Sequence, residues 1–308
     1  MKRTKIAELL LLAFLLTAFL PFSVTAQNGV DSVVSVLVVG DWGTGGKGAR
    51  RVGEAMAASH GSGAVQAIVS TGDNIYPSGV SCVDDPQWDS KFERIFPAES
   101  LPVPFWAILG NHDYRKNPDA QVAYTGHRLE DGSITRWKMP GRYWSTRLRS
   151  PDGAVELRLV GIDTQLLVGN AGTRKSHLAW LDSVLAASEE EHIFVIGHHP
   201  VYSHGHYGNN RTLVRHLAPL LVGHGVRAYL NGHEHDLQLI KPIDGVRYII
   251  SGGGGGKRKS TPGKHTEFSA SSLGFVRIDL RSDRMHIAYV DSGGKLLYET
   301  TDTFETKP

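Results

Sequence analysis

The sequence predicts an α/β protein whose last third is mainly β. In the first two thirds, short apolar runs typical of buried strands alternate with segments whose apolar residues have helical spacing. From Gln238 to Thr300 the pattern becomes strand, turn, strand. No Pro- or Ser-rich linker separates the two parts, and the glycine run 252–256 is expected to let backbone approach a site closely. We therefore expect one domain over residues 27–308.

The individual elements follow from the same patterns. Buried strands are predicted where apolar residues run without interruption, at 33–39, 65–69, 105–109, 193–196 and 226–230. Helices are predicted at 47–60, 86–96, 176–187 and 213–222, the second of them with Pro86 in its first turn. Residues 143–149 and 155–161 alternate like the partners of a hairpin, whereas residues 114–141 are expected to be irregular.

The first 26 residues are expected to be a signal peptide. Basic residues at 2, 3 and 5, an apolar stretch from Leu9 to Leu20 and small residues up to Ala26 are typical of secretion signals. A membrane span needs about 20 apolar residues, so cleavage after Ala26 is favoured over anchoring. The mature protein is expected to be exported, periplasmic or secreted, without stable membrane insertion.

Charge argues against one class of partner, and cysteine content limits how the fold can be stabilised. The chain has 33 basic and 31 acidic residues, and removal of Lys2, Arg3, Lys5 and Glu8 leaves no net charge. A nucleic-acid partner is therefore not expected. The single cysteine, Cys82, excludes an intrachain disulfide, so the exported chain has to rely on its core, a bound metal or both. The sequence carries no signal for the oligomeric state.

Five expected strands are each followed by glycine and then by Asp, Asn or His. The residues concerned are Asp41, Asp73, Asn111, His198, and the pair His233 and His235. Sites in α/β sheets collect at the carboxyl ends of strands, so these ends are expected to converge. Carboxylates, an amide oxygen and imidazoles favour iron, manganese or zinc. Asp73 has two oxygens and can bridge two ions about 3.5–4 Å apart, a clamp suited to in-line attack on phosphorus.

In this order the motifs resemble those of the metallophosphoesterases, the calcineurin-like superfamily. They are G-D at 40–41, G-D-x-x-Y at 72–76, G-N-H-D at 110–113, G-H at 197–198 and G-H-x-H at 232–235. Tyr76 stands where the serine/threonine phosphatase branch typically has Asp, and it matches the tyrosine that ligates ferric iron in purple acid phosphatases. Residues 92–96, 178–181, 197–201 and 229–235 also look like the small, mammalian-type (tartrate-resistant) members.

This resemblance implies a four-layer sandwich of two mixed β-sheets flanked by α-helices. It implies a ferric ion held by Asp41, Asp73, Tyr76 and His235, and a second, divalent ion (Fe, Zn or Mn) held by Asp73, Asn111, His198 and His233. His112 would hold a phosphate oxygen, and a loop histidine, His204 or His206, would protonate the leaving group. We favour His206, because Gly205 gives the backbone room to aim it. Asp113 follows the motif without being a ligand.

The expected activity is that of an acid phosphatase, a metal-dependent hydrolase that cleaves small phosphate monoesters by attack of a metal-activated hydroxide. A phenolate is a hard anionic donor that suits a trivalent ion, and such an ion acidifies water strongly. Two alternatives stay open. One is a phosphodiesterase or nucleotide phosphatase with two divalent ions, which metal content and visible colour would distinguish. The other is a non-catalytic exported metal- or phosphate-binding protein, which turnover would exclude.

Overall fold

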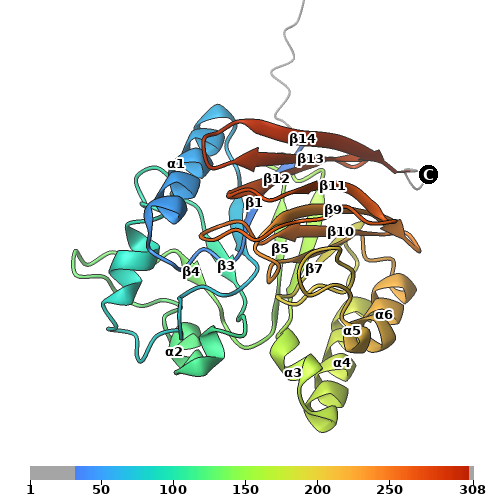
Figure 1. The fold of residues 1–308 in the computed structure, drawn as a ribbon, viewed down its shortest axis with the longest axis horizontal. Helices are drawn as coiled ribbons and strands as arrows, with labels where there is room; N and C mark the ends of the chain where they lie inside the picture. The colour runs from blue at the N-terminus through green and yellow to red at the C-terminus, as the bar shows by residue number, and fades with distance from the viewer. Residues whose placement is uncertain (1–31, 305–308) are drawn as a thin grey trace, which may run out of the picture. The chain divides into compact units, whose positions relative to one another are not determined.

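The computed structural model describes residues 32–304, and these belong to one compact unit built on two seven-stranded β-sheets (Figure 1). The expected signal peptide, residues 1–26, lies outside the described residues. The first sheet has the strand order β14-β13-β12-β1-β2-β3-β4. Its strands are β1 (Val34–Val39), β2 (Ala67–Ser70), β3 (Phe105–Ala107), β4 (Trp137–Lys138), β12 (Gly274–Leu280), β13 (Arg284–Asp291) and β14 (Leu296–Thr303).

The second sheet has the strand order β11-β9-β10-β8-β7-β6-β5. Its strands are β5 (Trp144–Arg149), β6 (Glu156–Gly161), β7 (His192–Ile196), β8 (Ala228–Asn231), β9 (Leu237–Ile243), β10 (Val246–Ser251) and β11 (Thr266–Ala270). Both sheets are mixed. In the first, β1 to β4 are parallel and β12 to β14 antiparallel. In the second, β6, β7, β8 and β10 are parallel, and β5, β9 and β11 pair antiparallel.

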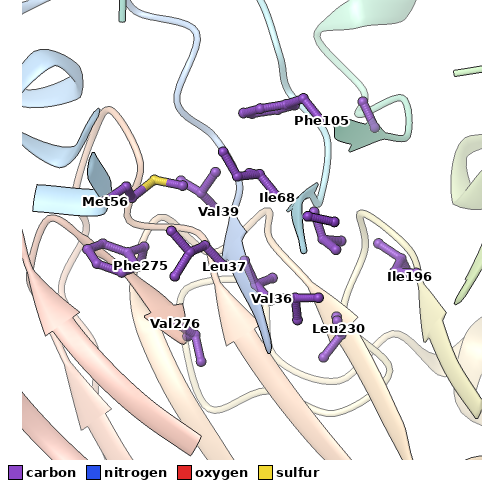
Figure 2. Close-up of a cluster of buried hydrophobic side chains, with 14 of the residues drawn as sticks. Val36, Leu37, Val39, Met56, Ile68, Phe105, Ile196, Leu230, Phe275 and Val276 are labelled. Carbon is purple, nitrogen blue, oxygen red and sulfur yellow. The ribbon is translucent and has the colours of Figure 1, made fainter. Parts of the chain in front are cut away.

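Strand β1 is buried on both of its faces, which explains its uninterrupted apolar sequence. Successive side chains of a strand point to opposite faces. Leu37 lies on the side of Met56 and Phe275, whereas Val36 lies on the side of Leu230 and Ile196 from the second sheet (Figure 2). The two sheets therefore share one core, and the carboxyl ends of their parallel strands are held at a fixed separation.

Helices cover the outer faces of the two sheets. Helix α1 (Lys47–Ser62) buries Val52 and Met56 in the core of the first sheet. The second sheet carries α3 (Thr164–Val168), α4 (Ala171–Ala186), α5 (Arg211–His216) and α6 (Ala218–Gly223). Leu181 and Leu221 of these helices pack in one cluster with Tyr229 of β8. The predicted four-layer sandwich of two mixed sheets and flanking helices is confirmed, and none of the described helices is long and apolar enough to cross a membrane.

Two predicted helices take a different form. The segment 86–96 contains a π-helix, Asp89–Glu93, in which the N–H of Arg94 donates to the carbonyl oxygen of Asp89 at 3.0 Å. The segment 213–222 is divided at Leu217 into α5 and α6. Pro219 explains the division, because proline has no N–H to donate and is tolerated in the first turn of a helix but not in its interior.

Other local structure was not expected from the sequence. The stretch 114–141 begins within the 3₁₀ turn Asp113–Arg115 and contains helix α2 (Pro118–Ala123) and strand β4. Helix α3 and the early start of α4 have clear caps, since Asp163 accepts from the N–H of Gln165 at 3.1 Å and Asn170 from the N–H of Gly172 at 2.7 Å. The predicted hairpin is confirmed, with β5 and β6 in antiparallel register.

Candidate metal centre

The carboxyl ends of five parallel strands, three in the first sheet and two in the second, meet at one place. Asp41 follows β1, Asp73 follows β2 and Asn111 follows β3. His198 follows β7, and His233 and His235 follow β8. The structure therefore brings together all seven residues predicted to be metal ligands, with Tyr76 three positions beyond Asp73. Their donor atoms form two groups that share Asp73.

The first group contains Asp41, Asp73, Tyr76 and His235. The phenolic oxygen of Tyr76 lies 3.0 Å from Asp41 Oδ1, 2.8 Å from Asp73 Oδ2 and 3.0 Å from His235 Nε2. His235 Nε2 is 3.4 Å from Asp41 Oδ1. The phenol has a single proton, so it can donate to only one of the two carboxylate oxygens. At least one of these oxygens is left without that donor, which is the arrangement that a cation satisfies.

The second group contains Asp73, Asn111, His198 and His233. His198 Nδ1 lies 2.9 Å from the carbonyl oxygen of Thr71, which can only accept, so Nδ1 carries the hydrogen and Nε2 has a lone pair. That lone pair lies 3.1 Å from Asn111 Oδ1, 3.1 Å from His233 Nδ1 and 3.6 Å from Asp73 Oδ2. The His198, Asn111 and Asp73 atoms of this group are therefore all acceptors, and they face one another. The two groups together fit two cations with Asp73 between them.

The backbone at these positions is unusual. Five non-glycine residues of the described part have positive φ, and four of them are Asp41 (57°), Asp73 (53°), His233 (73°) and His235 (56°). Positive φ is costly for a residue with a Cβ and is found where function requires it. Glycines give these side chains space: a Cβ on Gly110 would lie 2.2 Å from Asp73 Oδ1, and one on Gly232 would lie 2.4 Å from Asp41 Oδ2.

The glycine run 252–256 also approaches the centre, as predicted. A Cβ on Gly252 would lie 2.9 Å from the backbone nitrogen of His235 and 3.0 Å from Asp41 Oδ2. Gly256 lies on the other side, where a Cβ would be 3.3 Å from His235 Nδ1. The run therefore forms part of the wall of the first donor group and does not link domains.

The electrostatics of the cluster also fit a bound cation. Burial, followed by the nearby Asp73 carboxylate, raises the pKa of Asp41 well above its usual value. Burial likewise raises the pKa of Asp73 and that of Tyr76. Burial lowers the pKa of His198 and His233, and that of His235 to about 4, which favours the neutral imidazoles that can offer lone pairs to a metal. A cation stabilises the deprotonated form of every one of these groups, so it opposes the raised pKa of Asp41, Asp73 and Tyr76 and acts in the same direction as burial on the three histidines.

Two residues of the G-N-H-D motif support the donors. The backbone N–H of His112 donates to Asp73 Oδ1 at 2.8 Å, and His112 Nδ1 lies 2.7 Å from the Pro77 carbonyl oxygen. His112 Nε2 has no hydrogen-bond partner within residues 32–304. Asp113 is fully buried and accepts hydrogen bonds from the backbone N–H groups of Asn74 and Gly110, at 3.1 and 2.9 Å. Asp113 thus ties the two loops that carry Asp73 and Asn111.

The loop after His198 separates the two candidate proton donors. His204 lies away from the donor atoms: its ring is stacked near His265, and its Nε2 accepts from the His265 N–H at 3.4 Å. His206 is exposed and lies beside Tyr207, with ring centroids 4.8 Å apart. The ring of Tyr207 stacks on His233 at 4.2 Å. His206 is therefore connected to the metal centre through Tyr207, and His204 has no such connection among the contacts of the described residues.

Two residues next to the donors were missed by sequence reasoning. Tyr207 covers the ring of His233, and the guanidinium of Arg258 lies 5.1 Å from the centre of the Tyr207 ring. Glu234 is fully buried between two candidate ligands, and its carboxylate accepts from Ser203 Oγ at 2.5 Å and from the Tyr207 N–H at 3.0 Å. Glu234 therefore fixes the loop above the metal centre. A charged residue inside the G-H-x-H motif was the available signal for it.

The comparison with known protein families agrees with this geometry. Residues 34–237 match the calcineurin-like phosphoesterase family, and this range contains all of the predicted donor residues. The chain belongs to the calcineurin-like phosphoesterase family. The matched range begins at strand β1 and ends just after the G-H-x-H motif at 232–235. It therefore includes every strand end that carries a candidate donor in this phosphoesterase.

Among individual proteins, this phosphoesterase is similar to the purple acid phosphatases. It is 34% identical over 259 residues to tartrate-resistant acid phosphatase type 5 of Rattus norvegicus, covering 76% of this chain and 77% of the relative. It is 29% identical to purple acid phosphatase 3 of Arabidopsis thaliana, covering 89% of this chain and 79% of the relative. These sequence similarities confirm the predicted membership of the small, tartrate-resistant class of purple acid phosphatases.

Solved structures support the fold. GAP50, described as the anchor in the inner membrane complex of Plasmodium, superposes with a TM-score of 0.81 at 24% identity and covers 90% of each chain. Purple acid phosphatase PPD1 from yellow lupin (Lupinus luteus) superposes with a TM-score of 0.66 at 17% identity, covering 88% of this chain and 54% of the lupin chain. At these identities the likeness concerns the sandwich fold alone.

Proposed function

We propose that this phosphoesterase is a binuclear-metal acid phosphatase that hydrolyses small phosphate monoesters. The observation that carries the proposal is the pair of donor groups sharing Asp73, in which carboxylate, phenol, amide and imidazole atoms suited to metal binding lie 2.8–3.6 Å apart. The relatives that the chain resembles over about three quarters of its length are named acid phosphatases. Family membership and donor geometry therefore support the same class of reaction.

The finer proposal concerns the metals. The ligands of a ferric ion would be Asp41, Asp73, Tyr76 and His235, and those of a divalent ion (Fe, Zn or Mn) would be Asp73, Asn111, His198 and His233. Tyr76 supports the ferric assignment, because its oxygen lies within 3.0 Å of three other donors and a phenolate is a hard anionic ligand. Two such ions, when bound, acidify water and neutralise charge on phosphate oxygens.

The residues of the chain bind and orient the ester. The amide of Asn111 and the free Nε2 of His112 stand beside the shared Asp73, where they can hold phosphate oxygens. His206 is the proposed proton donor to the leaving group. Its support is its place next to Tyr207, which stacks on the candidate ligand His233. His204 is less favoured, since it lies against His265.

The two alternatives are less well supported. A phosphodiesterase or nucleotide phosphatase with two divalent ions does not account for the phenolic oxygen among the donors. A non-catalytic metal-binding protein does not need the open polar groups of His112 beside the centre. We also propose export to the periplasm or the outside of the cell, on the signal-like pattern of residues 1–26.

Metal analysis combined with visible spectroscopy tests the proposal. The purified protein is expected to contain ferric iron and one further ion per chain, to absorb in the visible range, and to hydrolyse 4-nitrophenyl phosphate at acidic pH. Tyr76→Phe should abolish the visible band while the fold is retained. Tyr202→Phe is the matched control, because Tyr202 is half-buried and packs against Tyr248 outside the donor groups. Its band should be unchanged.

Replacement of Asp73, the residue that both donor groups share, is a second and independent test. Asp73→Asn should lose at least one ion per chain and nearly all turnover, since one anionic oxygen that both groups use is removed. Two results contradict the assignment: a colourless wild type with full ferric iron, or an Asp73→Asn variant that keeps both ions and ordinary activity. Wild-type protein that binds both ions without hydrolysing any phosphate ester would favour the binding protein.

A further inference from the structure

A cavity opens directly beside the second donor group. It has a volume of about 390 Å³, and its wall includes His233, Tyr207, Asn209, Asn210 and Arg211. A second cavity of about 550 Å³ shares Asn209 and Arg211 with it and adds Arg215. A volume of this order suits a small molecule. Because His233 is a candidate metal ligand, a group bound in the first cavity is next to the reacting phosphate.

Two side-chain amides in the lining of this cavity have their oxygens already engaged. The carboxamide oxygen of Asn209 already accepts from the Ser203 N–H at 2.9 Å. That of Asn210 accepts from the N–H groups of Thr212 and Leu213, both at 3.1 Å. The amide NH₂ groups of both residues have no hydrogen-bond partner among residues 32–304 and can donate to a ligand. A ligand with several acceptor oxygens would satisfy both amides.

The charge of the cavity is also of one sign. Arg211 is exposed and has no ion-pair or hydrogen-bond partner for its guanidinium among residues 32–304. No Asp or Glu is among the described residues that line either cavity. Arg94, an exposed arginine elsewhere on the surface, is by contrast paired with Asp89 at 2.7 Å. A guanidinium with no carboxylate near it, surrounded by amide donors, matches a phosphate group, which it can bind through two parallel hydrogen bonds.

We propose that this cavity, which we call the Arg211 pocket, is a leaving-group subsite for phosphate monoesters that carry a second phosphoryl group. The inference rests on the proposed function, because the first phosphate has to occupy the metal centre beside His233. Arg211 and the amides of Asn209 and Asn210 bind the second phosphate, and the ring of Tyr207 forms the wall between the two groups. Arg211 is then a specificity-determining residue.

The experiment compares propane-1,3-diol bisphosphate with propane-1,3-diol monophosphate, whose leaving groups differ mainly in the second phosphate. Wild-type, metal-loaded enzyme should show a kcat/KM for the bisphosphate that is at least about 10-fold higher, beyond the factor of two for its two equivalent ends. Arg211→Gln should lower this value by roughly 10–100-fold, mainly through KM, as expected for loss of hydrogen bonds to a charged group. Its kcat/KM for the monophosphate should change by less than about twofold.

Binding provides a readout that does not need turnover. Propane-1,3-diyl bisphosphonate should bind to wild type more tightly than propylphosphonate in calorimetry, and Arg211→Gln should remove that difference. Arg94→Gln is the control, because it deletes an exposed arginine elsewhere and should leave both ligands unaffected. The pocket assignment is overturned if the two ligands bind equally, if Arg211→Gln affects both substrates equally, or if Arg94→Gln has the same effect. Failure of wild type to hydrolyse even the monophosphate would instead overturn the proposed phosphatase activity.

Discussion

Replacing Asp113 tests whether the metal centre is held together by a residue that is not itself a ligand. Its buried carboxylate accepts from the backbone N–H groups of Asn74 (3.1 Å), Ile75 (3.2 Å) and Gly110 (2.9 Å), and from Gln121 Nε2 (2.8 Å). Burial, followed by the Asp73 carboxylate, raises its pKa to about 7. Asn74 Nδ2 also donates to it at 3.3 Å but keeps the Ile108 carbonyl and Gln121 Oε1 as acceptors, so Asp113→Ala removes the acceptor for the other four donors at once.

The size of the effect follows from those four donors. Truncation leaves space for about one water molecule, which has two lone pairs and can accept from two of them. Two donors then remain buried without a partner, each at about 1–3 kcal/mol. We therefore expect Asp113→Ala to lower the free energy of unfolding by roughly 2–6 kcal/mol. Asp113→Asn keeps one acceptor oxygen, so its free energy of unfolding should lie between those of Asp113→Ala and wild type.

Urea denaturation of the metal-loaded protein measures the change, with metal content after dialysis against a chelator as the second readout. Both ions should still bind to Asp113→Ala, but about 10–100-fold more weakly, as is typical when residues that orient ligands are lost. Asp84→Ala is the control: the Asp84 side chain is 80% exposed, and the change should be within about 0.5 kcal/mol of zero. An Asp113→Ala protein with wild-type stability and metal retention would refute the reasoning.

Three further predictions follow from particular contacts. Gly110→Ala should lose metal and activity, because the new Cβ would lie 2.3 Å from the Asp73 backbone nitrogen. The control Gly61→Ala, whose Cβ would have nothing within 4 Å, should keep both, and metal analysis of the two variants tests this. Burial lowers the pKa of His177 to about 4 from an ordinary 6.5, so the unfolded chain binds more protons and stability is lost as the pH falls from 6.5 towards 4. His177→Gln should remove about 2–3 kcal/mol of that pH dependence in denaturation measured at pH 7 and pH 4.5, and an unchanged slope would contradict the assignment. His206→Ala should lower the rate of hydrolysis of an alkyl phosphate by roughly 10²–10⁴-fold more than that of an aryl phosphate, since only the alkoxide leaving group needs a proton. The same pattern in His204→Ala instead would identify His204 as the proton donor.

The strands and the donors could be predicted from sequence because both depend on local signals. Strands such as β1 are buried on two faces, so their apolar runs are continuous. The donors follow those strands directly, where the topology of parallel sheets brings separate strand ends together. Helix boundaries could be predicted less well from the sequence. Leu217 divides a helix because of a proline two residues later, and the apolar spacing around it gives no sign of the break.

The supporting residues could not be predicted, because their partners are distant in sequence. Asp113 bonds to Asn74, 39 residues earlier, and Glu234 bonds to Ser203, 31 residues earlier. Nothing in the local sequence distinguishes such a carboxylate from an exposed one. Tyr207 was missed for the same reason, since its ring contacts His233 from another loop. Sequence therefore identified the candidate donor atoms and left out the groups that fix them.

The glycines near the donors are more informative than the donors themselves. Asp and His are common in polar loops, but Asp41, Asp73, His233 and His235 have positive φ, a conformation that costs of order 1–3 kcal/mol at each residue. A surface loop would relax to a cheaper conformation. Here each donor is fixed by a close neighbour, and those neighbours leave space for no Cβ at Gly110 or Gly232. Three of the five glycine-donor pairs at strand ends, those of Asp41, Asp73 and His233, thus combine a costly donor backbone with a glycine beside it, and this combination indicates backbone that is held in place for binding.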